Sequence, residues 1–500
     1  MSGLLGNLSS TTSALQAQSK AVELTAKNIA NVNNPNYARQ RLSGGSISTT
    51  AGGGVETVVT LEVQQIRDKY LDSKVIQEVS YSSSLSARDS RLRELLGVLG
   101  ESIDRVNDPA FIGDTPADDG GIRSSLNDFF NAFENFSARP TDEASKFVVM
   151  QSAEDIVNAL NRSDSRIDVI EASIDTEINT ELNAFNNRLI ELSEMNKKIA
   201  KVEAVTGLGS AADLRDERQA TLEQISGFIQ IEVTEVDGAN GQVSLSVRDS
   251  SGDQVEILRP SYEPYGVFYD SANNAFRSRN SSENLDLQAG KLSSLSQVKG
   301  DDIVQLRSQM DDLANTIATE VNELYYQAFV PAGVDPAVPE MSFFAQPTPP
   351  PSVSGVPSTV DAGNIALYAG SSDPLVTSSV PLSQDSLRAS GSTFAGSNDI
   401  AKAIAGLPDL DFSGLGGQRM AGFVTGIAVG IAQDIESVSN QLEVQKDMEA
   451  LIKDQRAQVS GVSMDEELAN LIQYQRAFQA TSRVFSVLSE MLETVVTGLR

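Results

Sequence analysis

The feature that most constrains the fold is an apolar repeat of seven residues near the C-terminus. From Ser463 onward the segment contains no Gly or Pro before Gly498, and Ser463 and Glu466 stand in capping-box spacing. A strict seven-residue repeat specifies a left-handed coiled coil. We therefore expect one helix of about 35 residues that needs helical partners on more than one side. The repeat consists of Met464, Leu471, Phe478, Phe485, Leu492 and Leu499.

A second repeat with the same period lies at the other end of the chain. Alanines at intermediate positions would let a partner helix approach closely. Two such helices at opposite ends of a chain of 500 residues predict that the termini pair and carry the residues between them. This N-terminal repeat consists of Leu8, Leu15, Val22 and Ile29.

The composition excludes several kinds of chemistry. The chain has no Cys, His or Trp, which removes thiol nucleophiles, imidazole bases, disulfides and the usual zinc ligands. Its formal net charge of −30 disfavours nucleic acid and anionic membrane surfaces as partners. The first residues do not form a secretory signal, and the longest uncharged apolar run, about 14 residues from Met420, is too short to span a bilayer. We expect no cofactor, no metal, no nucleic-acid partner and no membrane insertion.

The apolar period changes along the chain. It is helical over most of 55–330, but Ile229, Ile231 and Val233 alternate with polar residues and predict strands within about 228–290. Ten of the 17 prolines fall between Val330 and Pro381, which favours an extended linker or a small irregular projection there. The predicted fold is mainly α with a small β part: a long-helix bundle with terminal coiled-coil helices, a β-hairpin subdomain and an irregular Pro-rich or β insert.

These patterns predict five parts of the chain. Glycines at 44–45 and 52–54 indicate a polar hinge between the first part and the second. The parts are an N-terminal coiled-coil helix and turn (1–45), a long-helix bundle with the β subdomain (55–330), a Pro-rich insert or small projecting domain (331–400), a returning long helix (401–460), and a C-terminal coiled-coil helix that pairs with the N-terminal one (461–500).

A chain reversal is predicted directly after the N-terminal helix. Four Asn and one Pro fall within Asn31–Asn36, and Asn tolerates left-handed backbone while Pro fixes φ. On physical grounds alone this segment is a loop. Its residues nevertheless resemble the signature that follows the first helix of bacterial flagellar axial proteins, Ala-Asn-x-x-Thr-Pro-Gly-Tyr-x-Arg. The matching residues, with a common extension at both ends, are Asn28, Ala30, Asn31, Pro35, Tyr37, Arg39 and Gln40.

Two departures and two further segments refine the resemblance. Asn34 replaces the usual Thr and Asn36 the usual Gly, and Asn is the residue other than Gly best able to adopt positive φ. The segment 213–218 looks like the family's Leu-Asp-Gln-Arg-Asp, and 460–467 looks like its C-terminal Ser-Gly-Val-Asn-Leu-Asp-Glu-Glu. Within the family the chain is most similar to proteins of the hook–filament junction.

The resemblance implies a structural function. The protein would be secreted through the flagellar type III export apparatus after a transient stay in the cytoplasm, with an export chaperone on its C-terminal helix. It would then polymerise as a ring of its own copies between hook protein and the second hook–filament junction protein. The two apolar repeats would supply the polymerisation and chaperone interface.

Two other classes of function were weighed against this one. An extracellular coiled-coil adhesin or tether would share the helices and the acidic charge, but it would not need the turn at Asn31–Arg39. A hydrolase with paired carboxylates is compatible with the 68 Asp and Glu residues. Pairs such as Asp118–Asp119, Asp311–Asp312 and Glu466–Glu467 stand at loop or helix-surface spacing, however, so a solvated face explains them better and no enzyme is predicted.

Overall fold

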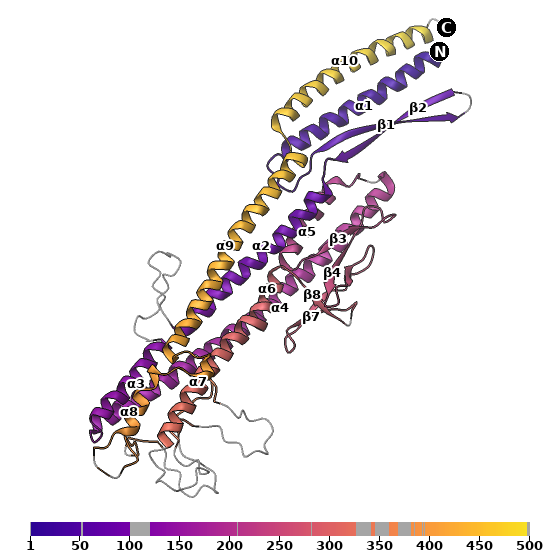
Figure 1. Ribbon diagram of the computed structural model, residues 1–500. Helices are drawn as coiled ribbons and strands as arrows, with labels where there is room; N and C mark the ends of the chain where they lie inside the picture. Colours follow the sequence, from indigo (N-terminus) through magenta and orange to yellow (C-terminus); the bar gives the residue numbers. More distant parts are fainter. Residues whose placement is uncertain are drawn as a thin grey trace. The chain divides into compact units, whose positions relative to one another are not determined.

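The computed structural model describes residues 2–51, 54–100, 121–207, 209–281, 283–326, 342–345, 360–368, 382–384, 386–392, 394 and 396–497. It is mainly α with a small β part, which confirms the predicted fold class (Figure 1). Two compact units account for the chain. Unit 1 comprises Met1–Ser86, Ile178–Ser294 and Gln441–Arg500, and unit 2 comprises Ala87–Glu177 and Leu295–Asn440.

In unit 1 the two terminal helices pack against each other. Helix α1 spans Ser2–Ala30 and α10 spans Met464–Thr497, and the two run antiparallel with both chain ends at the same end of the pair (Figure 1). The apolar residues of the N-terminal repeat are half-buried in α1. The seven-residue repeats therefore placed both helices correctly, although Leu499 lies outside the described residues.

A β-hairpin follows the turn after α1. Strand β1 (Gln40–Ala51) pairs antiparallel with β2 (Gly54–Gln65), from Gln40 opposite Gln65 to Ala51 opposite Gly54. The expected hinge at 44–45 is wrong, since both glycines lie inside β1 and pair with residues of β2. Half of the 12 residues of β2 are Val or Thr, and β1 adds Ile47, Thr49 and Thr50. These β-branched residues favour strand over the flexibility that two glycines suggest.

The remaining helices of unit 1 form a bundle. Helix α9 contacts α2 through a hydrogen bond from Gln445 Nε2 to the Glu78 carbonyl oxygen (3.4 Å), and it contacts α5 through the Arg456–Glu223 ion pair. The boundary between the units falls within α2, α4, α6 and α9. The helices are α2 (Lys69–Leu96), α4 (Glu143–Thr206), α5 (Ala212–Phe228), α6 (Lys291–Gln297) and α9 (Met420–Ser460).

A six-stranded antiparallel sheet lies on α4. Two asparagines of α4 hold it: Asn196 Nδ2 donates to the Val243 carbonyl oxygen (2.9 Å), and Asn186 Nδ2 donates to that of Val267 (2.8 Å). The strands are ordered β3-β4-β8-β7-β6, and β5 also pairs with β4. They are β3 (Glu232–Glu235), β4 (Val243–Asp249), β5 (Gln254–Leu258), β6 (Val267–Asp270), β7 (Ala275–Ser278) and β8 (Asn284–Asp286).

Unit 2 packs around an aromatic core. Phe129 and Phe133 of α3 contact Phe343 edge-on or tilted, with ring centroids 5.8 and 5.6 Å apart, and Phe343 also contacts Tyr325 at 5.3 Å. The aromatic stripe of α3 is thus core, as its three- and four-residue spacing indicates. The regular elements are α3 (Ile122–Ala138), α7 (Ile303–Tyr326) and α8 (Asp399–Ala405), the π-helical turn Val298–Asp302, and short 3-10 turns at Gly97–Leu99, Leu407–Asp409 and Ser413–Leu415.

Part of the Pro-rich insert belongs to this core. Asn322 Oδ1 accepts hydrogen bonds from the backbone N–H groups of Phe343 and Phe344 (both 2.8 Å), and both phenylalanine side chains are fully buried. The expectation of a linker or projection did not include this anchor. The triple proline 349–351 lies outside the described residues.

Among the described residues, no helix combines the length and apolar character needed to cross a bilayer.

Candidate functional site

The turn after α1 is joined to the start of α10 through Asn28. This side chain is 2% exposed, and all four of its hydrogen-bonding positions are used. Its Oδ1 accepts from Tyr37 OH (2.8 Å) and from the Gln40 backbone N–H (3.0 Å). Its Nδ2 donates to the Gln40 carbonyl oxygen (2.9 Å) and to Glu467 Oε2 (3.0 Å). Asn28 therefore fixes the turn, the first residue of β1 and helix α10 to one another.

Arg39 holds the elbow between α9 and α10. Its Nε donates to Glu467 Oε1 (2.7 Å) and its Nη1 donates to Glu466 Oε2 (2.8 Å), while its backbone N–H donates to the Ser460 carbonyl oxygen (2.8 Å). Glu467 is 2% exposed, so the solvated face expected for Glu466–Glu467 is wrong for this residue, because the fold buries its carboxylate against Arg39. We call the set Asn28, Tyr37, Arg39, Gln40, Glu466 and Glu467 the elbow lock.

The turn itself forms differently from the expectation. Asn34 Oδ1 accepts a hydrogen bond from the Asn36 backbone N–H (3.1 Å), which makes an Asx turn. Within the part of the chain that the structure describes, the residues other than Gly with positive φ are Asn240, Ser261, Asn274 and Gln288. Asn36 is not among them, so it does not need the left-handed backbone expected from the glycine it replaces.

Two charged side chains, Asp216 of α5 and Arg67, pack against the turn. Asp216 Oδ1 accepts from Arg67 Nη2 (2.7 Å), from Gln65 Nε2 (2.9 Å) and from the Ala38 backbone N–H (3.3 Å). Burial raises the pKa of Asp216 to about 6 even though the Arg67 guanidinium favours its charged form. Its second oxygen, Oδ2, is buried and has no hydrogen-bond partner among the described residues. Burial likewise raises the pKa of the Tyr37 phenol, so this hydroxyl remains a donor.

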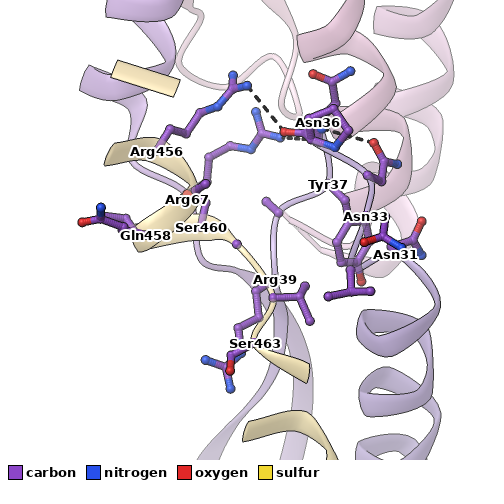
Figure 2. A pocket seen from close by; sticks show the side chains of 18 of the residues that line it. Asn31, Asn33, Asn36, Tyr37, Arg39, Arg67, Arg456, Gln458, Ser460 and Ser463 are labelled. Carbon is purple, nitrogen blue, oxygen red and sulfur yellow. Dashed lines mark hydrogen bonds between the residues drawn. The ribbon is translucent and has the colours of Figure 1, made fainter. Parts of the chain in front are cut away.

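Two arginines bind the outer side of the turn through its backbone. Arg67 Nη2 donates to the Asn36 carbonyl oxygen (3.2 Å) and Arg456 Nη2 to that of Pro35 (3.5 Å), as Figure 2 shows. Arg456 also forms ion pairs with Glu223 and, at 3.6 Å, with Asp72. A pocket of about 560 Å³ opens between this turn and the α9–α10 elbow. The sequence did not single out Arg67 or Arg456, whose partners lie on other elements.

The terminal helices leave much of their apolar surface exposed. Along the α10 repeat, Leu471, Phe485 and Leu492 are half-buried, whereas Met464 is 39% and Phe478 40% exposed. The pair α1–α10 thus covers only part of the predicted stripe. Further apolar residues of α10 are exposed outside the repeat: Leu468, Ile472, Val484, Val487 and Met491.

The remaining residues that match the family signature differ in how exposed they are. Ala30 and Pro35 are exposed, and Asn31 is half-buried with its Nδ2 donating to the Lys27 carbonyl oxygen (3.0 Å). Among the described residues, no group of three or more carboxylates is arranged to hold a metal ion. What the geometry provides is a rigid joint that carries a partly uncovered pair of helices.

Three family models match separate parts of the chain. Residues 115–334 match the flagellar hook-associated protein FlgK helical domain. Residues 8–37 match the flagella basal body rod protein family, and residues 453–498 match the C-terminal region of the flagellar basal body rod FlgEFG proteins. The two shorter matches contain α1 with the turn and α10 with the elbow, which are the segments that the elbow lock joins.

Relatives extend over nearly the whole sequence. Flagellar hook-associated protein 1 of Bacillus subtilis is 24% identical, across 97% of this chain and 96% of that protein. Over nearly its whole length the chain is similar to flagellar hook-associated protein 1. It is a structural component of the flagellar hook–filament junction. Flagellar hook-associated protein 1 of Salmonella typhimurium is 22% identical, across 99% of this chain and all of that protein.

The fold is also similar to that of a solved protein. The flagellar hook junction protein FlgK from Burkholderia pseudomallei superposes with a TM-score of 0.56, at 12% identity, over 78% of this chain and all of that one. At this identity the likeness concerns the fold alone.

Proposed function

We propose that this chain joins hook to filament by polymerising through its paired terminal helices. Its partners would be hook protein on one side, the second hook–filament junction protein on the other, and copies of itself in a ring. The observation that carries this proposal is the exposed apolar surface of α10, which a monomer in water leaves uncovered.

The position of that surface on the helix favours an assembly that extends beyond two subunits. When α10 is viewed along its axis, Leu468 and Ile472 lie on one flank of the seam with α1, whereas Val484, Val487 and Met491 lie on the other. Different patches on two flanks make heterologous contacts, and such contacts generate rings or helical tubes instead of closed dimers.

Before assembly the same surface needs protection. We propose that an export chaperone covers α10 in the cytoplasm, that the protein then leaves through the flagellar type III apparatus, and that it is secreted to the growing flagellum. Phe478 and Phe485 would serve the chaperone first and neighbouring subunits afterwards. The exposed fraction of Phe478, 40%, supports this sequence of partners.

We further propose that the protein is not an enzyme. The ionisable groups of the elbow lock are engaged with one another, as the Arg39–Glu466 and Arg39–Glu467 ion pairs illustrate. A structural role in holding two helices at a fixed joint accounts for them.

Deletion of the gene tests the proposed role. Electron microscopy of the deletion strain should show hooks without attached filaments, and expression of the intact gene from a plasmid should restore the filaments. Complementation with the same gene carrying an early stop codon provides the matched control. Filaments of normal number on the deletion strain would contradict the proposal and favour an extracellular tether.

A further inference from the structure

A second pocket in unit 1 lies beside the turn between β3 and β4. It measures about 610 Å³ and is bordered by α5, the start of α2 and the turn residues 237–241. We call it the β-turn pocket. Arg67 and Asp72 line both this pocket and the one at the elbow, but Arg218 and Gln242 line only the β-turn pocket.

Arg218 is the unusual residue of this pocket. Its side chain is 6% exposed, and its Nη1 donates to the Gly241 carbonyl oxygen (2.6 Å) and, at 3.5 Å, to Asn196 Oδ1. Both acceptors are neutral. In the described ranges of the chain, no carboxylate lies within ion-pair distance of Arg218. Buried cations normally have such a partner, because removing an unpaired charge from water is costly.

The other cations of the β-turn pocket are paired. Arg215 Nε lies 2.7 Å from Glu203 Oε1, and Lys69 pairs with Glu235. Arg67 pairs with Asp72 (3.1 Å), whose carboxylate is thereby occupied. Asp237 also lines the pocket, but it is exposed within the turn. Among these four cations, Arg218 is the one with no carboxylate within ion-pair distance in the part of the chain that the structure describes.

Two further hydrogen-bond donors at the pocket have no acceptor. Arg67 Nε and Gln242 Nε2 are buried, and neither finds a partner among the described residues. Gln242 is 3% exposed, and its Oε1 already accepts from Ser261 Oγ (3.1 Å). Native proteins seldom leave such groups unpaired, because burying a donor without an acceptor is costly. A pocket that holds two unpaired donors and a buried guanidinium bound only to neutral acceptors fits an anionic acceptor.

The charge on Arg218 persists at neutral pH. Burial, followed by the neighbouring Arg215, lowers the pKa of its guanidinium to about 10. The group thus remains protonated while its burial strengthens its attraction for an anion.

We propose that the β-turn pocket binds a carboxylate, supplied by an acidic side chain of an adjoining subunit in the assembled fibre. This proposal rests on the proposed junction function. A guanidinium offers parallel N–H groups that fit the two oxygens of a carboxylate. A second copy of the chain is rich in such groups, since it carries 68 Asp and Glu residues against 38 Lys and Arg.

Nuclear magnetic resonance on the intact chain tests the proposal with a small probe. The Nε–Hε signal of Arg218, assigned by its loss in Arg218→Lys, is followed during titration with N-acetyl-aspartate amide at constant ionic strength. N-acetyl-asparagine amide is the matched neutral probe, and inorganic phosphate tests whether any oxyanion suffices. We expect a saturable shift with the aspartate probe and an apparent affinity at least about tenfold weaker for the asparagine probe.

Two variants separate binding from general charge effects. Arg218→Lys keeps the positive charge but lacks the planar guanidinium with its parallel N–H groups. The shifts of neighbouring signals with the aspartate probe should therefore be lost. Arg248→Lys changes an exposed arginine that pairs with Glu232, and it should leave binding unchanged. If Arg218→Lys fails to fold, Gln242→Met removes one donor and should weaken binding several-fold.

The outcomes decide the proposal independently of the junction function. Saturation by phosphate with none by the aspartate probe would overturn the assignment of a carboxylate. No saturable response, or an undiminished response in Arg218→Lys, would overturn the site itself. Hooks that lack filaments in the deletion strain would leave the junction function standing in either case.

Discussion

Asn28 and Glu467 stand 439 positions apart in the sequence, and a hydrogen bond of 3.0 Å joins Asn28 Nδ2 to Glu467 Oε2. Both side chains are 2% exposed. This contact closes the chain on itself at the point where the two terminal helices leave the rest of unit 1. The turn after α1 orients the Asn28 amide for this contact, because Tyr37 and Gln40 bind its oxygen.

Asn28→Ala should destabilise unit 1 by about 3 kcal/mol. The change leaves the Tyr37 hydroxyl, the Gln40 backbone and the Glu467 carboxylate without a shared partner in a buried place. Hydrogen exchange of the unit 1 backbone amides measures the loss. Asn34→Ala is the matched control: its side chain is exposed and accepts from Asn36, so it should cost less than about 1 kcal/mol. Equal effects of the two changes would contradict the role given to Asn28.

Gly461→Ala should disturb the elbow between α9 and α10. A Cβ at this position would overlap the Ala457 carbonyl oxygen and lie 3.1 Å from its carbonyl carbon, so backbone would have to move. Urea unfolding should show that the free energy of unfolding falls by about 1–3 kcal/mol.

Gly430→Ala, inside α9, is the control for this change. A Cβ there meets nothing within 4 Å, and alanine favours helix, so stability should rise by about 0.5–1 kcal/mol. A Gly461→Ala variant as stable as the wild type would show that the elbow tolerates another geometry.

Asp216 should make the stability of unit 1 depend on pH between about 4 and 6. Its folded pKa, about 6, exceeds the value of 3.8 for an unperturbed Asp, so the folded state binds the proton more readily than the unfolded state. As the pH falls from 7 through this window, this carboxyl group therefore increases the free energy of unfolding, by on the order of 2–3 kcal/mol in total.

Asp216→Asn isolates that contribution. The amide keeps the Oδ1 acceptor for Arg67 and Gln65 but removes the titration. Unfolding by urea at several pH values should give wild-type and variant curves that converge as the pH falls toward 4 and separate toward 7, with the wild type relatively weaker at neutral pH. Parallel curves across the range would show that Asp216 does not titrate there.

Replacing Phe478 and Phe485 together by Ser should abolish chaperone binding while the unfolding of unit 2 stays unchanged. Both residues belong to the α10 repeat, and Phe478 is 40% exposed. Co-purification with the export chaperone measures the first effect and calorimetry the second. Val444→Ser with Met448→Ser is the control, since both residues are exposed apolar positions of α9. Undiminished chaperone affinity in the double Phe variant would refute the shared use of this face.

The terminal pair could be predicted because its signal is local. The seven-residue repeat specifies helices that need partners, and the matching period at the two ends identified those partners. The hairpin β1–β2 was missed because its glycines suggested a hinge, whereas pairing along the strands decides the structure. Strands β6–β8 escaped prediction because they are only three or four residues long.

The charged part of the site could not be predicted from spacing. Arg67 and Asp216 are 149 positions apart, and nothing in either local sequence marks them as partners. In the sequence, Arg456 looks like an ordinary polar residue of a long helix. In the structure it is 7% exposed and binds both the turn and Glu223. Burial of a charge depends on how helices cross, and apolar periodicity does not encode that crossing.

The central claim is that the paired terminal helices attach the protein to the flagellum. The most direct measurement is cell-surface labelling of an epitope-tagged chain in the deletion strain, comparing full length with variants lacking 1–32 or 464–500. We predict label at hook tips for the full-length chain and none for either variant, with unit 2 still folded by calorimetry. A truncated variant that still reaches the hook tip would contradict the account.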